Sequence, residues 1–229
     1  MSERDLPEEL VLYILDLCFE LPSEDFLRFP TPDGARKNPS RNADILLVSR
    51  RWLRIGSPLL FASLRLSDPE HAISVARQLK NNPGLGSVIC DVRIEGDCGD
   101  DLGSVLALTP NIQRLYVALD QKNNARAEGL RRALPYINPR EVFIMDMTRM
   151  LRAFPLFPWG RGMRADEAMA AVEHVIAGHW SELQCVHLGP CNEVTPSLSQ
   201  ALERANAARA QRSSPALRIK RQRASVGIQ

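Results

Sequence analysis

The stretch NIQRLYVAL, residues 111–119, contains the short pattern that decides the fold. Leu115 and Val117 are two positions apart, which is the spacing of residues on one face of a β-strand. Ile112 lies three positions before Leu115. The same alternation returns along the chain, so we expect a sheet assembled from separate short strands. The expected strands are residues 64–66, 92–94, 115–117, 142–144 and 186–188, with 217–219 as a candidate sixth.

Upstream apolar residues extend three of these strands into a longer pattern. Ile89, Ile112 and Leu183 each precede a strand by three positions. The resulting L-x-x-L-x-L spacing is typical of the strand in a leucine-rich repeat. Such a repeat buries its apolar face only against its neighbours, which favours a short irregular solenoid with parallel strands lining one face. The fold class predicted is therefore α/β.

The segments between the strands favour helices, because several combine helical composition with a nearby proline. The expected helices are residues 71–79, 125–134, 166–176 and 198–210. The interval before the fifth strand is long enough to require an insertion. It contains an aromatic and proline-rich loop with Phe154, Phe157 and Trp159. Exposed aromatic residues are favoured binding anchors, so these three form a candidate target-binding element; an equal alternative is a plug that fills a gap in the solenoid.

The N-terminal region has a different, helical character. Leu10, Ile14 and Leu17 recur at steps of three and four, which predicts an amphipathic helix beginning close to Leu6 with Pro7 in its first turn. A proline-rich stretch over residues 22–41 predicts an exposed loop. A second helix is expected over residues 43–55 and should end near the glycine and proline that follow it.

Composition and charge place the chain among ordinary globular proteins. Of its 229 residues, 45% are hydrophobic and 24% charged. The start is charged and no apolar run is long enough to cross a bilayer, so we expect neither a signal peptide nor a membrane partner. The five cysteines include no Cys-x-x-Cys pair, which favours reduced thiols in an intracellular protein over disulfides or a zinc site.

Motifs for catalysis are not found in this sequence. It contains no Gly-x-Ser-x-Gly elbow, phosphate loop or His-Glu-x-x-His, and its four histidines are scattered. The acidic stretch EGDCGDD, residues 95–101, lacks the ligand spacing of a calcium-binding EF-hand and is interpreted as a solvated turn. We therefore expect no catalytic residue, no metal and no cofactor.

Two N-terminal motifs together resemble a known family. The segments LPEELVLYIL and LLVSRRWLRIGSPLLF, residues 6–15 and 46–61, resemble the F-box motif, particularly in fungal F-box proteins. The downstream leucine-rich segments resemble the regions that follow the motif in that group. One departure is that the distance between the Leu-Pro step and the tryptophan is longer than usual, so residues 22–41 look like an inserted loop.

The resemblance implies an F-box domain over residues 1–62 and a leucine-rich-repeat-like, substrate-binding region over residues 63–229. It implies a non-catalytic receptor subunit of an SCF-type ubiquitin ligase, in which the F-box binds a Skp-type adaptor and, through it, a cullin. The repeats would hold an unknown protein target. The adaptor-binding residues implied are Leu6, Pro7, Leu10, Ile14, Leu47, Val48 and Trp52.

Two alternatives stay open at this stage. The repeats could form a protein-interaction scaffold that has no ligase connection. The basic C-terminal tail, which follows the final acidic residue Glu203, is compatible with nuclear import or weak phosphate binding, although a solvated tail explains it equally simply. Nucleic acid is not an expected partner, and a cytoplasmic or nuclear location is expected.

Overall fold

The computed structural model describes residues 6–19, 43–95, 98–119, 125–146, 165–189 and 194–221. The chain divides into two compact units, Met1–Ser63 and Leu64–Gln229, and each is described by itself. We call the first unit the head and the second the repeat unit. Among the described residues, no helix has both the length and the apolar character needed to cross a bilayer.

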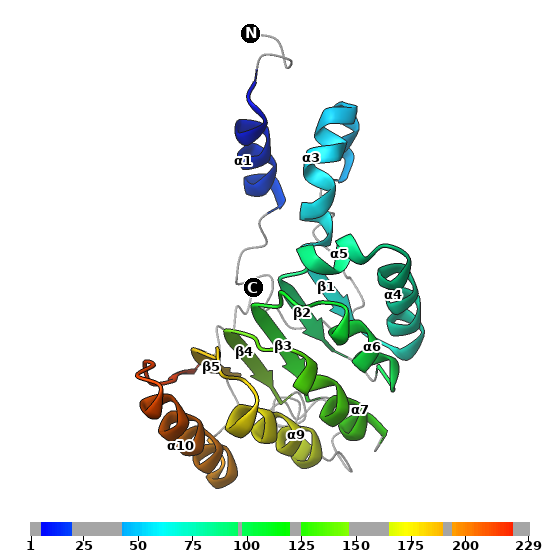
Figure 1. The fold of residues 1–229 in the computed structure, drawn as a ribbon. Helices are drawn as coiled ribbons and strands as arrows, with labels where there is room; N and C mark the ends of the chain where they lie inside the picture. The colour runs from blue at the N-terminus through cyan, green and yellow to red at the C-terminus, as the bar shows by residue number, and fades with distance from the viewer. Residues whose placement is uncertain are drawn as a thin grey trace, which may run out of the picture. The chain divides into compact units, whose positions relative to one another are not determined.

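The repeat unit is organised around one six-stranded sheet (Figure 1). Its strands follow one another in chain order, from β1 to β6, and the pairs from β2 onward are parallel. This confirms the predicted α/β class and the sixth strand. The strands are β1 (Ser63–Leu66), β2 (Asp91–Ile94), β3 (Arg114–Ala118), β4 (Glu141–Met145), β5 (Cys185–Leu188) and β6 (Arg218–Arg221).

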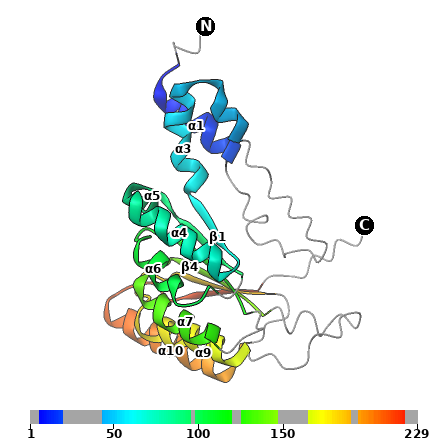
Figure 2. The same ribbon diagram turned by 90° about the vertical axis from the view of Figure 1, so that its right-hand side faces the viewer.

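Helical segments connect these strands, as parallel pairing requires. Figures 1 and 2 show the long helices covering one face of the sheet. Neighbouring helices pack in the same order as the strands, α4 on α6, α6 on α7, α7 on α9 and α9 on α10. The segments are α4 (Pro69–Asn81), α5 (Pro83–Val88), α6 (Asp101–Ala107), α7 (Ala125–Ala133), η3 (Leu134–Tyr136), α9 (Ala165–Gly178) and α10 (Pro196–Gln211).

The main hydrophobic core lies between the strands and these helices. Leu115 and Val117 are fully buried in it, as are their counterparts on the neighbouring strands. The three upstream residues of the sequence pattern, Ile89, Ile112 and Leu183, are also buried there. The aliphatic alternation therefore identifies the face of each strand that packs on the helices.

A recurring backbone hydrogen bond joins the segments that precede neighbouring strands. The Gln113 N–H donates to the Cys90 carbonyl at 2.7 Å, the Arg140 N–H to Gln113 at 2.8 Å, and the Gln184 N–H to Arg140 at 2.7 Å. Each of these residues lies just before a strand, so equivalent positions in successive turns of the chain are bonded directly. Although the sequence is irregular, the backbone connection from one strand to the next is therefore the same.

Two short helices were not predicted. Helices α5 and α6 have six and seven residues and contain Gly84, Gly86 and Gly103, which hide the helical pattern. The predicted turn at residues 95–101 ends where α6 begins, at Asp101, and Gly99 in that turn has a φ of +59°, which favours glycine.

The head contains α1 (Glu8–Phe19), the 3₁₀ helix η2 (Ala43–Val48) and α3 (Arg50–Phe61). Helix α1 begins two residues later than predicted, since Pro7 lies before it and its carbonyl accepts from the Val11 N–H at 3.2 Å. The prediction of a single helix over residues 43–55 is wrong in two ways. The helix is interrupted at Ser49, and its second part continues through Gly56 and Pro58.

Tertiary packing explains why Gly56 does not end the helix. A Cβ at this position would collide with the Leu46 side chain and lie 3.0 Å from Leu15 Cδ1. Gly56 is therefore the point at which α3 approaches η2 and α1 most closely. A glycine that looks like a helix terminator in the sequence is instead required for close packing.

Two glycines of α5 provide a matched test of packing in the repeat unit. A Cβ at Gly86 would collide with the Leu108 carbonyl oxygen, whereas a Cβ at Gly84 meets only the Asn82 side chain, at 3.6 Å. We expect Gly86→Ala to lower the free energy of unfolding by about 1–3 kcal/mol because it overpacks the contact. Gly84→Ala should leave it unchanged or raise it by up to about 1 kcal/mol. Urea denaturation of both variants measures this, and equal stability of the two would contradict the assigned contact.

Candidate docking surface

Helix α1 has two apolar faces rather than one. Val11, Leu15 and Phe19 are buried and form the head core together with Leu46. The adjacent face is also apolar but stays exposed, because four residues at helical spacing point away from this core. These residues, which we call the α1 stripe, are Leu10, Tyr13, Ile14 and Leu17.

The segment η2 separates neighbouring aliphatic residues into core and surface. Leu46 is 1% exposed, whereas the adjacent Leu47 is 76% exposed and Val48 is 58% exposed. Ser49 then adopts an extended backbone, and its Oγ accepts from the Trp52 N–H at 3.2 Å. This side-chain bond caps the N-terminus of α3 and explains the serine of the Val-Ser-Arg-Arg-Trp motif.

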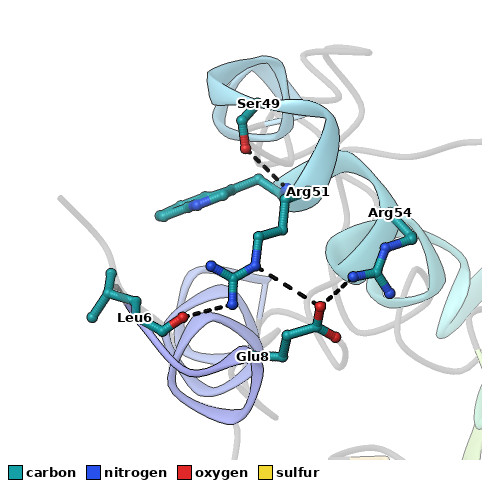
Figure 3. Close-up of polar contacts among 6 residues, drawn as sticks. Leu6, Glu8, Ser49, Arg51 and Arg54 are labelled. Atoms are coloured by element: carbon teal, nitrogen blue, oxygen red, sulfur yellow. Dashed lines mark hydrogen bonds and ion pairs between the residues drawn. The ribbon is translucent and has the colours of Figure 1, made fainter. Parts of the chain in front are cut away.

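Polar contacts tie the beginning of α1 to α3 (Figure 3). The Arg51 guanidinium donates to the Leu6 carbonyl at 2.6 Å, and its Nε lies 3.9 Å from the Glu8 carboxylate. Glu8 also forms an ion pair with Arg54. The Glu8 pair is half-exposed and contributes little stability, but the bond to the Leu6 backbone fixes where the Leu-Pro step lies relative to α3.

The residues implied by the F-box resemblance fall into two groups in the head. Pro7, Leu10, Ile14, Leu47 and Val48 are exposed. The remaining two, Leu6 and Trp52, are partly buried and pack against the head core.

The packing of Trp52 buries its indole N–H. Its Nε1 is buried and finds no acceptor in the described part of the chain. Trp52 is thus partly buried in the head, whereas the five exposed residues are accessible at its surface.

Several exposed apolar residues of the head were not among the predicted contacts. Tyr13 and Leu17 lie on the α1 stripe, and Leu53 and Phe61 are exposed on α3. Leu17 was already one of the apolar residues, spaced three and four apart, from which helix α1 was predicted. For the other three, no sequence signal separates a surface position from a core position. The predicted target-binding residues Phe154, Phe157 and Trp159 lie outside the described residues.

The repeat unit also has a row of interacting side chains on the sheet face opposite the core residues. The strand register places Arg93, Tyr116, Phe143, His187 and Lys220 side by side, and we call them the mid-sheet row. The Arg93 guanidinium lies 4.0 Å from the centre of the Tyr116 ring, and the Phe143 and His187 rings stack with centres 4.0 Å apart. Burial falls along the row, from Tyr116, which is fully buried, to Lys220, which is exposed.

Burial also affects the protonation of two residues in this row. It raises the pKa of Tyr116 to about 12, so the phenol stays neutral at physiological pH. Burial lowers the pKa of His187; Glu141, whose carboxylate is 3.4 Å away, opposes this effect, and Lys220 reinforces it. His187 is consequently neutral at pH 7.

The four described cysteines differ in their exposure. Cys98 and Cys185 are buried, Cys90 is partly buried and Cys18 is exposed. Burial raises the pKa of the Cys185 thiol, so it remains protonated and unreactive. Within the described ranges, no group of three or more His, Cys, Asp or Glu side chains could hold a metal ion.

In comparisons with protein-family models, curated proteins and solved structures, nothing matches the chain. Its function must therefore be argued from its own residues.

Two neighbouring leucines in η2 test the division between core and surface. We expect Leu46→Ala to cost about 2–5 kcal/mol of head stability because it leaves a cavity. Leu47→Ala should change stability by no more than about 0.5 kcal/mol. Hydrogen exchange at the α1 amides reports on the head alone, and equal acceleration in both variants would show that Leu47 also belongs to the core.

Acidification tests the environment of His187. Its pKa is lowered in the folded protein, so below about pH 6.5 the unfolded chain binds a proton more readily and folding loses stability as the pH falls. We expect the decrease in thermal midpoint between about pH 7.5 and about pH 5.5 to be smaller in His187→Gln than in the natural protein. An equal or larger decrease in the variant would contradict this assignment.

Proposed function

We propose that the head is an F-box-type docking domain and that the chain recruits a target protein to an SCF-type ubiquitin ligase. In this proposal the head binds a Skp-type adaptor, the adaptor links it to a cullin, and the repeat unit holds the target. The chain itself supplies no catalytic residue. The observation that carries the proposal is the exposed apolar surface of α1 and η2, which lies beside a core that is already complete.

The extent of this surface favours a protein partner. Among the described residues, the head core consists of Val11, Leu15, Phe19 and Leu46, with six partly buried residues packed around it. A unit this small cannot bury the α1 stripe as well, and contiguous exposed apolar residues of this kind mark interaction sites. The partner's own apolar groups would remove Leu47 and Val48 from water.

The positions of these residues also support an F-box assignment. Five of the seven residues implied by the resemblance are exposed, and they come from both motifs, with Pro7, Leu10 and Ile14 from the first and Leu47 and Val48 from the second. Helix α1 packs against α3 although residues 22–41 separate the two motifs in the sequence. The long connection is compatible with this packing, because the cost of loop closure grows only slowly with loop length.

The second unit is suited to holding a target. We infer that it is a leucine-rich-repeat-like solenoid, since its strands follow in chain order, its helices cover one face, and one backbone bond recurs between turns. Such an arrangement leaves the edges of the sheet for recognition. Ligases of this type act in the cytoplasm and the nucleus, so the proposal includes either location.

Adaptor capture by the full-length chain tests the proposal. We expect purified Skp-type adaptor to bind the chain, and a complex with cullin to form on its addition. Leu47→Asp combined with Val48→Asp should weaken adaptor binding at least about tenfold, because the charges would be buried in the interface. Biolayer interferometry measures the affinity.

The matched control is Ile73→Asp, which introduces a charge at an exposed aliphatic residue of α4 in the repeat unit. This variant should bind the adaptor like the natural chain, and unchanged hydrogen exchange in α1 verifies that the head of each variant is folded. Undiminished binding by the double variant would remove Leu47 and Val48 from the site. Failure of the natural chain to bind would favour the alternative of a repeat scaffold without a ligase connection.

A further inference from the structure

Strand β6 is chemically unlike the other strands of the sheet. It is the last strand in the sheet order and pairs with β5. All four of its residues, Arg218 to Arg221, are exposed, including Ile219 at 45%. The strands β2, β3 and β4 are almost entirely buried. The accessible end of the sheet is therefore a short, basic edge.

The backbone of β6 offers hydrogen-bonding groups on its outer side. The Arg218 N–H donates at 3.0 Å to the carbonyl of Gln184, the residue just before β5, so Arg218 and Lys220 direct their backbone groups toward β5. Backbone direction alternates along a strand, which turns the N–H and C=O groups of Ile219 and Arg221 outward. Just before the strand, the outward Leu217 N–H is occupied by the Asn206 side chain at 2.8 Å.

The charged side chains of β6 itself are all basic. No Asp or Glu follows Glu203 in the sequence. By the register, Arg218 and Lys220 lie on the same sheet face as His187, whereas Arg221 is paired with Leu188 and lies on the other face. A peptide segment extended along this edge would therefore contact basic side chains on both faces of the sheet.

One nearby arginine does not contribute to this surface. Arg209 is buried, and its guanidinium donates to the carbonyls of Ser181, Leu183 and Pro215 at 2.5–2.9 Å. It holds the turn that leads into β6. In the described part of the chain the bases of β6 make no such contacts, and their exposed positions suit a partner of opposite charge.

We propose that the outer edge of β6 docks an extended, acidic segment of a partner protein, which adds a further strand to the sheet. Unpaired strand edges are templates for such addition, with backbone bonds giving affinity and side chains giving specificity. The acidic character follows from charge complementarity. A second copy of this chain is disfavoured as the occupant because two basic β6 edges repel each other. This inference does not depend on adaptor binding by the head.

Peptide binding to the full-length chain tests the proposal. The probe is a fluorescein-labelled octapeptide of alternating Glu and Thr, whose binding is followed by fluorescence anisotropy at low salt. We expect saturable binding, and slower amide hydrogen exchange at Ile219 and Arg221 on addition of peptide. Exchange at Arg218 and Lys220 should change little, because their N–H groups already face β5.

Two variants separate strand addition from simple charge attraction. Ile219→Pro removes one outward N–H and no charge, and proline is tolerated at a strand edge where its N–H would face solvent. It should weaken peptide binding at least about fivefold. Arg218→Glu combined with Lys220→Glu should abolish binding. The control, Arg77→Glu combined with Lys80→Glu on the exposed side of α4, makes the same change in net charge and should bind like the natural chain.

Three results would overturn the proposal. Full binding by Ile219→Pro, with its thermal midpoint unchanged, would show that the backbone edge is not used. Equal loss of binding in the α4 control would indicate attraction to the overall charge. Tighter binding of a single-stranded oligonucleotide of equal charge, with exchange at Ile219 unaffected by either probe, would assign the basic edge to nucleic acid instead.

Discussion

Parallel strand pairing in chain order is the constraint on which the repeat unit depends. A parallel strand cannot be reached by a tight turn, so the chain must cross over to the other end of the sheet before each new strand. The crossovers here place helices on one face, and this leaves the mid-sheet row on the other. Because the order never reverses, β6 has no neighbouring strand on its outer side in the described part of the chain. The aliphatic core, the mixed row and the basic edge all follow from this one pattern of connection.

The head is limited by a different constraint, the small size of its hydrophobic core. Two helices and one 3₁₀ turn enclose a few residues, and the contact at Gly56 makes this core as compact as the side chains of Leu15 and Leu46 allow. The compactness has a consequence for the remaining leucines. Apolar residues one position away from the core, such as Leu47 beside Leu46, are left at the surface. A partner that covers them would gain the hydrophobic free energy that the head alone cannot recover.

The strands could be predicted from the sequence because residues such as Leu115 and Val117 repeat a two-residue period that only a strand satisfies. The faces of α1 could not, since both of its faces are apolar and the choice between Leu10 and Val11 depends on what α3 presents. Gly56 and Pro58 were misinterpreted for the same reason: local preference for a helix end was outweighed by packing across the head. Helices α5 and α6 are too short to show a period. The candidate docking residues stay a prediction from the family resemblance, and their division into core and surface required the tertiary contacts.

The backbone bond that links Gln113, Arg140 and Gln184 has an implication for how such a chain can change over evolutionary time. Each turn is attached through the same main-chain atoms, which every residue other than proline possesses, so side chains near the bond are free to vary. A duplicated turn would therefore find its attachment point regardless of its exact sequence. The length of the array can change by whole turns while the existing core stays intact, and new recognition surfaces can arise at the growing end without redesign of the head.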